Sequence, residues 1–144
     1  MSIVAFHVPG KPQGKARART VYNKHLKNTV SYTPENNLLY ENLIKSMYIQ
    51  AAKGTKFEKE VPITLRITAN FLPAKSISKK KQQQMLSGEL LPLKKPDIDN
   101  IVKVVADALN GVAYRDDTQI VYVAAKKAYS EEEGLDITVE EYTD

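Results

Sequence analysis

The chain has 144 residues, with 21 Lys or Arg against 17 Asp or Glu and a formal net charge of +4 at pH 7. This length predicts one domain over residues 1–144, large enough for a hydrophobic core. The absence of cysteine excludes disulfides, thiolate zinc sites and cysteine nucleophiles. The sequence has no signal-peptide core and no run of about 20 apolar residues, so we expect a cytoplasmic protein.

The charge is unevenly distributed along the chain. Residues 1–30 contain six Lys or Arg and no acidic residue, whereas residues 131–144 contain seven acidic residues and no basic one. A basic half of this kind predicts a polyanionic partner, such as nucleic acid.

A basic segment follows the first predicted element, a strand over Ser2–Val8. Residues 11–31 have little periodicity and a dense scatter of cations, which predicts a long basic loop or arm. Compact domains rarely keep such long loops unless these are functional or disordered. In an extended chain, Lys15, Arg17 and Arg19 face one way and would follow a DNA phosphate backbone. A solvated charge run without a partner is the alternative interpretation.

A helix is predicted from Pro34 to Ala52. It opens with Thr33, Pro34 and Glu35, in the favoured order of cap, first-turn proline and early acid. Its expected buried face consists of Leu38, Leu39, Leu43, Ile44 and Met47. Residues 61–71, VPITLRITANF, then alternate between apolar and polar residues and predict a strand.

A lysine-rich segment leads toward the acidic part of the chain. Residues 76–87 predict a short helix. The lysines on and after this helix are candidate contacts to DNA phosphates: Lys79, Lys80, Lys81, Lys94 and Lys95. Lysine runs are usually solvated faces, so the reason to consider DNA here is that the run leads to a group of carboxylates.

Residues 97–109 predict another helix. Pro96 disfavours helical backbone in the residue before it, so the helix begins after it, with Asp99 as the expected N-cap. The expected buried stripe is Ile98, Ile101, Val102, Val105 and Leu109. Asn110 and Gly111 supply the stop, because glycine best adopts the left-handed conformation after a helix.

Carboxylates gather around this helix. Asp99, Lys103 and Asp107 follow at four-residue intervals and share one face, and Asp116 and Asp117 stand directly before the next predicted strand. Oxygen ligands without histidine or cysteine suit Mg²⁺. Taken singly, these residues are better explained as a helix cap, a surface ion pair and a turn before a strand. Taken together, they indicate a metal site in which Lys103 holds a phosphate oxygen.

The last two predicted strands, Thr118–Tyr129 and Leu135–Tyr142, are expected to pair antiparallel across a turn at residues 132–134. The order of elements predicts an α+β domain with a mixed β-sheet, helices packed on one face and a long basic N-terminal loop. The carboxylates are expected at one end of that sheet.

The stretch PDIDNIVKVVADALNGVAYRDDTQI closely resembles the signature of the RusA family of Holliday junction resolvases. The shared features are an Asp-x-Asp-Asn-x-x-Lys helix start, then Asp-Ala-Leu-Asn-Gly, then Asp-Asp-x-Gln-Ile, over about 25 residues. The resemblance implies an Mg²⁺-dependent, structure-selective endodeoxyribonuclease, encoded by a bacterium or a prophage, that acts as a homodimer on four-way DNA junctions in recombination and repair. By position, it implies that Asp97, Asp99 and Asp117 bind the metal and that Lys103 is essential.

Two function classes remain as alternatives to the nuclease. The first is a non-catalytic DNA-binding protein with structural aspartates, which a cleavage assay with metal separates from a nuclease. The second is a sugar-nucleotide transferase that holds a metal diphosphate at Asp97 and Asp99. The short chain, the basic arm and the lack of a nucleotide-binding glycine loop disfavour the transferase.

Overall fold

The computed structural model describes residues 2–16, 19–25, 27–32 and 34–144. Its centre is a four-stranded sheet in the order β1-β6-β4-β5, in which β4 and β5 are parallel and the other neighbouring pairs are antiparallel. The strands are β1 (Ile3–Pro9), β4 (Ile63–Phe71), β5 (Ile120–Tyr129) and β6 (Gly134–Glu141). The predicted α+β class with a mixed sheet is therefore confirmed.

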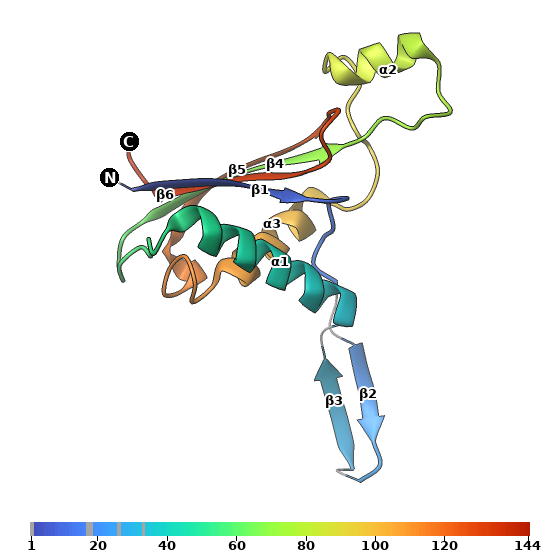
Figure 1. The fold of residues 1–144 in the computed structure, drawn as a ribbon. Helices are drawn as coiled ribbons and strands as arrows, with labels where there is room; N and C mark the ends of the chain where they lie inside the picture. The colour runs from blue at the N-terminus through green and yellow to red at the C-terminus, as the bar shows by residue number, and fades with distance from the viewer. Residues whose placement is uncertain (1, 17–18, 26, 33) are drawn as a thin grey trace.

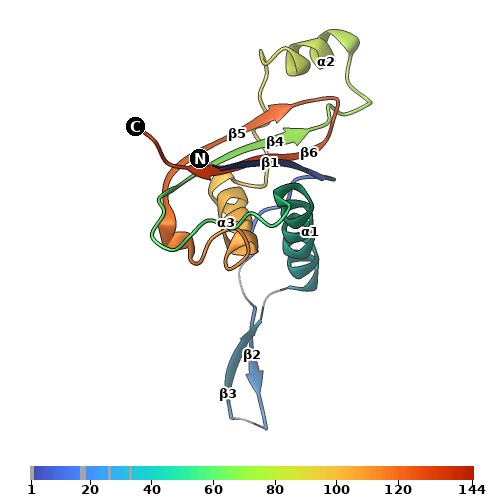
Figure 2. The same ribbon diagram turned by 60° about the vertical axis from the view of Figure 1, so that its left-hand side comes forward.

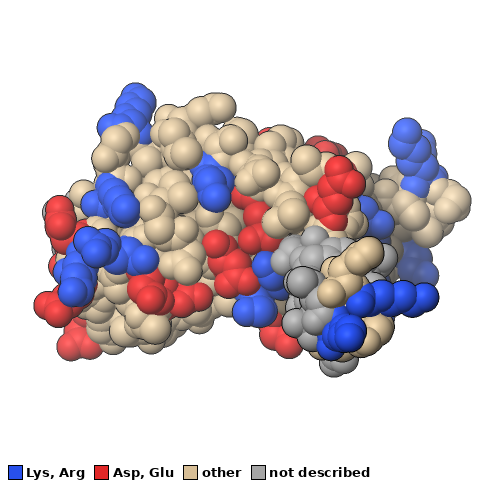
Figure 3. All heavy atoms as spheres, turned by 90° about the horizontal axis from the view of Figure 1, so that it is seen from below, with Lys and Arg blue, Asp and Glu red and all other residues tan. Residues whose placement is uncertain are grey.

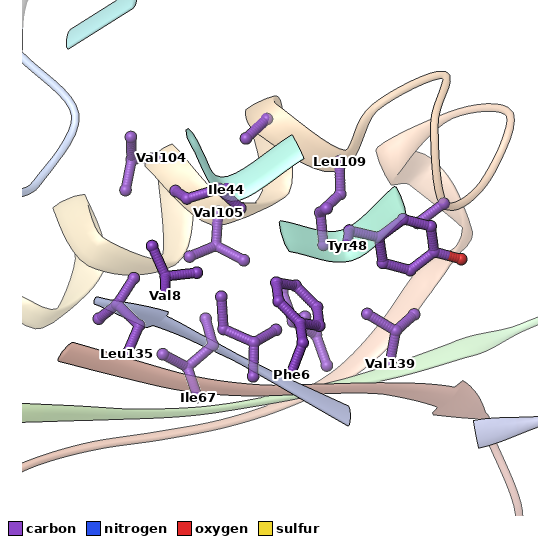
Figure 4. Packing of buried hydrophobic residues seen from close by; sticks show 14 of the residues in the cluster. Phe6, Val8, Ile44, Tyr48, Ile67, Val104, Val105, Leu109, Leu135 and Val139 are labelled. Carbon is purple, nitrogen blue, oxygen red and sulfur yellow. The ribbon is translucent and has the colours of Figure 1, made fainter. Parts of the chain in front are cut away.

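Two helices, α1 (Glu35–Ala52) and α3 (Ile98–Leu109), lie side by side on one face of the sheet (Figures 1 and 2). The core lies between these helices and the sheet, where side chains of β1, β4 and β6 point toward those of α1 and α3 (Figure 4). Phe6 of β1 meets Tyr48 of α1 edge to face, with ring centroids 5.7 Å apart. The prediction of helices on one face is confirmed for α1 and α3 (Figures 1 and 2).

The predicted pairing of the last two strands is wrong. β5 and β6 are not neighbours, because β4 lies between them and pairs with both. β4 is almost continuously buried, as expected for a central strand. The alternation of apolar and polar residues predicts which face of a strand is buried but not which strand lies beside it. The pairing of β5 with β6 was predicted only because they are consecutive in the chain.

The predicted buried face of α1 is wrong in part. The buried residues are Asn37, Tyr40, Ile44, Tyr48 and Ala52. Leu38 and Leu39 are exposed, because two tyrosines and an asparagine take the positions facing the sheet and the N-terminal segment. Of the predicted set, only Ile44 is fully buried, while Leu43 and Met47 pack against the edge of the core. The predicted cap Thr33 lies outside the described residues.

Two elements extend from the body in opposite directions (Figures 1 and 2). Within the predicted basic loop, β2 (Arg19–Asn23) and β3 (Asn28–Tyr32) form an antiparallel hairpin that the sequence analysis did not anticipate. On the other side, α2 (Lys79–Leu86) begins after Ser78, whose Oγ accepts a hydrogen bond of 3.2 Å from the Lys81 amide. No helix in the described ranges is both long and apolar enough to cross a lipid bilayer.

Candidate active site

The N-terminus of α3 presents two exposed carboxylates. Asp97, not Asp99 as predicted, is the N-cap residue, and the Asn100 amide donates to the Asp97 carbonyl (3.1 Å) and to Asp99 Oδ1 (3.0 Å). The Asp97 carboxylate accepts no capping hydrogen bond from this fully described turn. Since a capping aspartate normally bonds the first-turn amides, its side chain is left available for a ligand.

The side of α3 that faces the sheet differs slightly from the prediction. Its buried residues are Ile101, Val104, Val105, Ala108 and Leu109. Ile98 is exposed and Val102 only partly buried, because Val104 and Ala108, rather than these two residues, face the sheet. This orientation leaves Asp99, Lys103 and Asp107 on the outward face.

Two lysines converge on Asp107. Lys103 Nζ lies 3.6 Å from Asp107 Oδ2, which confirms the predicted i, i+4 proximity. Lys15 Nζ lies 3.2 Å from the same oxygen and 2.9 Å from Glu41 Oε2 of α1. Partial burial lowers the pKa of Lys15, but the hydrogen bonds to Glu41 and Asp107 outweigh it and raise that pKa above its ordinary value. Lys15 therefore joins the N-terminal segment to both helices.

Asp117 lies in the same electrostatic neighbourhood. Burial, the adjacent Asp116 and the carboxylate of Asp107 raise the pKa of Asp117, and Lys103 opposes them. Asp116 differs, because a hydrogen bond from the Thr118 amide (3.0 Å) lowers its pKa. An added cation would relieve the crowding of negative charge around Asp117.

Gln119 is a structural residue whose role the sequence analysis missed. Its Oε1 accepts hydrogen bonds from the amides of Arg115 (2.9 Å) and Asp116 (3.1 Å). Its Nε2 donates to the carbonyls of Glu58 (2.9 Å) and Val61 (3.1 Å). One side chain thus joins the turn that carries the paired aspartates to the loop before β4.

Replacing Gln119 by Glu should destabilise the fold by about 1–2 kcal/mol, because a carboxylate cannot donate to the two carbonyls that the amide holds. Urea unfolding measures this change. Gln83→Glu on the exposed surface of α2 is the control and should shift stability by no more than about 0.5 kcal/mol. Equal unfolding midpoints for Gln119→Glu and wild type would show that the two hydrogen bonds donated by the amide contribute nothing.

A hollow of about 380 Å³ lies against the N-terminal end of α3. Its lining includes Asp97, Asn100 and three lysines, Lys11, Lys15 and Lys95. A carboxylate beside three cations suits a metal-bound or lysine-bound phosphate group.

The N-terminal segment around Gly14 and Lys15 packs closely against α3 beside this hollow. The Lys15 amide donates to the Asn100 carbonyl (2.8 Å), and a Cβ added at Gly14 would lie 2.8 Å from Asn100 Cβ. The buried Asn37 side chain donates to the Gly14 carbonyl (3.0 Å) and accepts from the Ala16 amide (3.2 Å). These contacts fix the start of the N-terminal arm relative to α1 and α3.

The remaining predicted DNA contacts are dispersed. Lys79, Lys80 and Lys81 form the exposed first turn of α2. Lys94 Nζ lies 5.4 Å from the centre of the Phe71 ring, in a cation–π arrangement. Arg17 lies outside the described residues, and Arg19 begins β2.

The carboxylates do not form a ready-made cage for a metal. Within the described ranges, no three acidic or histidine side chains lie close enough together to hold one ion. The structure groups Asp107 with Asp117 and places Asp97 and Asp99 at the start of α3. Figure 3 shows acidic side chains in the middle of the face that is seen from below, next to basic ones. Mg²⁺ usually takes one or two protein carboxylates and keeps several waters, so the residues present fit it in that manner.

The family model for endodeoxyribonuclease RusA matches residues 9–140, which include both helices, the paired aspartates and Gln119. The chain belongs to the RusA family. Among relatives in sequence, the chain is 31% identical over 144 residues to the uncharacterized protein YqaN of Bacillus subtilis (strain 168), with 98% of each chain covered. It is 35% identical over 86 residues, 59% of each chain, to the crossover junction endodeoxyribonuclease rusA of Lactococcus phage r1t.

Membership of the RusA family agrees with the resemblance between the aspartate-rich stretch and the signature of that family. The matched range begins just before Gly14 and Lys15, so it also covers the N-terminal contacts of the candidate site. The family match thus extends well beyond the stretch of about 25 residues that first suggested it.

Proposed function

We propose that this protein is an Mg²⁺-dependent endodeoxyribonuclease that resolves four-way DNA junctions by paired phosphodiester cuts, in recombination and repair. The supporting observation is the convergence of Asp107, Asp117, Lys103 and Lys15 on the outward side of α3, a helix whose N-terminus carries two exposed aspartates. The chain's membership of the RusA family and the printed name of the phage relative agree with this chemistry.

The proposed ligands of the metal are Asp97, Asp99 and Asp117. When bound, Mg²⁺ would lower the pKa of a water and offset charge on the scissile phosphate. Lys103 would neutralise the charge that develops on the phosphate or on the leaving oxygen, because its ammonium is exposed and stands beside Asp107. Lys15, which is mostly buried, would hold Asp107 in place rather than move toward DNA.

DNA binding is proposed to involve the basic elements on both sides of α3. The hairpin and α2 extend from the body in opposite directions and would increase the length of DNA that the protein contacts (Figure 1). The cations assigned to DNA are Arg17, Arg19, Lys79, Lys80, Lys81, Lys94 and Lys95, whereas Lys15, predicted as a DNA contact, is assigned to holding Asp107. Among these cations, Lys95 lines the same hollow as Asp97, a proposed metal ligand.

The proposal includes a two-fold homodimer, since a four-way junction is resolved only when two strands of like polarity are both cut. The sequence has one Asp-x-Asp-Asn motif and no internal repeat, so one chain would carry one site. An isologous dimer presents two matched sites related by the same kind of axis as the junction.

Mixing Asp97→Asn subunits with wild-type subunits should give heterodimers that nick one strand of a junction without resolving it. The measurement uses junctions labelled on each strand in turn, separated on native and denaturing gels. Wild-type homodimers are the control and should give symmetrical cuts in opposing strands. Paired cuts made by a stable monomer of 16.2 kDa would contradict both the assembly and the mechanism.

A further inference from the structure

A second cavity lies on the other side of the paired aspartates. It is an open cavity of about 620 Å³ between the loop before β4 and the turn before β5. Gln119, which lines it, joins these two segments through hydrogen bonds to both. The cavity walls are therefore fixed relative to each other before any ligand binds.

Two cations face this cavity from different segments, Lys59 from the loop and Arg115 from the turn. Both side chains are exposed, and neither forms an ion pair with a carboxylate in the described part of the chain. Lys56 joins them around an adjoining hollow of about 170 Å³. Basic side chains are visible at the end of the molecule away from the hairpin (Figure 3). Unpaired cations that converge on one cavity favour an anionic ligand.

The rest of the lining restricts how such a ligand is oriented. Glu60 and Asp116 also line the cavity, so a ligand has to present its negative charge to the side of Lys59 and Arg115. An apolar wall is formed by Val61, Pro62 and Val121. A ligand with an anionic group at one end and a less polar group at the other fits this lining. A nucleotide of DNA is such a ligand, with its phosphate at one end and its sugar and base at the other.

The cavity borders the candidate active site at the paired aspartates. Asp116 lines the cavity, and its neighbour Asp117 shares an electrostatic neighbourhood with Asp107 and Lys103. The hollow that contains Asp97 lies at the N-terminal end of α3, a helix of 12 residues and therefore about 18 Å long. A DNA strand that follows the outward face of α3 would thus meet a basic hollow, the aspartates and then this cavity.

We propose that this cavity binds one nucleotide of the DNA strand that passes through the candidate active site. The phosphate contacts Arg115 and Lys59, and the sugar and base lie against Val61, Pro62 and Val121. This inference rests on the proposed nuclease function, and it names substrate-binding residues outside the aspartate motif.

The test measures binding of a fluorescent four-way junction in EDTA over a series of salt concentrations, so that affinity is determined without cleavage. The variants are Arg115→Ala, Lys59→Ala and the double substitution. Lys126→Ala is the matched control, because Lys126 is exposed on β5 and lines a different hollow with Arg66 and Thr68.

The double variant should bind the junction roughly three- to tenfold more weakly and with a log–log salt slope shallower by about 0.7–0.9, the value for one lost phosphate contact. Lys126→Ala should keep the wild-type slope. Arg115→Lys should restore part of the slope, because it restores a positive charge at a position where the fold does not depend on the side chain. In single-turnover cleavage with Mg²⁺, the double variant should need more enzyme for half-saturation and reach a near wild-type maximal rate.

Equal affinity and equal slope in the double variant and in Lys126→Ala would overturn the inference. If the wild type binds no DNA at all, both this inference and the proposed function are wrong. If it binds but does not cut with Mg²⁺, only the nuclease proposal fails, and the binding data still decide the role of Arg115 and Lys59.

Discussion

Asparagine in place of Asp97, Asp99 or Asp117 should reduce junction cleavage by at least about a hundredfold while leaving junction binding intact or tighter. Asparagine keeps the size of the side chain but removes the charge that holds Mg²⁺. Loss of negative charge beside a phosphate should also favour binding. For Asp117 the fold should tolerate the change well, because burial and the neighbouring carboxylates of Asp116 and Asp107 already disfavour its charged form.

Single-turnover cleavage in Mg²⁺ and anisotropy binding in EDTA measure the two effects separately. Asp144→Asn at the exposed C-terminus is the control and should leave both quantities unchanged. Cleavage at near wild-type rates by all three active-site variants would show that the assignment of these aspartates is wrong.

Lys103→Ala should lower the single-turnover cleavage rate by roughly a hundredfold or more, if the ammonium stabilises charge that develops in the transition state. The side chain is 62% exposed, and its contact with Asp107 is a surface i, i+4 pair worth about 0.3–0.5 kcal/mol, so the fold should persist. Lys103→Arg should not restore the rate fully, because a planar guanidinium does not place its charge where a compact ammonium does.

The same assay on Lys126→Ala controls for the loss of one surface charge. A normal cleavage rate for Lys103→Ala at saturating enzyme would remove this lysine from the mechanism. A lower rate that recovers at higher DNA concentration would instead assign it to binding.

Local features of the fold were predictable from the sequence. The proximity of Lys103 and Asp107 follows from helical spacing alone, and the structure places Nζ and Oδ2 3.6 Å apart. The α+β class was predictable for the same reason, since each helix and sheet strand has its own periodicity. The hairpin β2–β3 was not anticipated, because its cation-rich segment lacks that periodicity.

Long-range contacts were not predictable from patterns. Gln119 belongs to the Asp-Asp-x-Gln-Ile motif, but the carbonyls it holds belong to Glu58 and Val61, 61 and 58 residues away in the chain. Lys15 was predicted as a DNA contact, and its ion pair with Glu41 depends on how the N-terminal segment crosses α1. The predicted pairing of β5 with β6 was wrong for the same reason. β4 lies between these two strands, although they are consecutive in sequence.

The most direct test of the nuclease proposal compares a four-way junction with a linear duplex of the same sequence, each incubated with the protein in Mg²⁺ and in EDTA. We expect paired, symmetrical cuts in the junction with Mg²⁺, no cuts with EDTA, and an intact duplex under both conditions. Binding of the junction without any cleavage in Mg²⁺, or equal cleavage of junction and duplex, would contradict a metal-dependent junction resolvase.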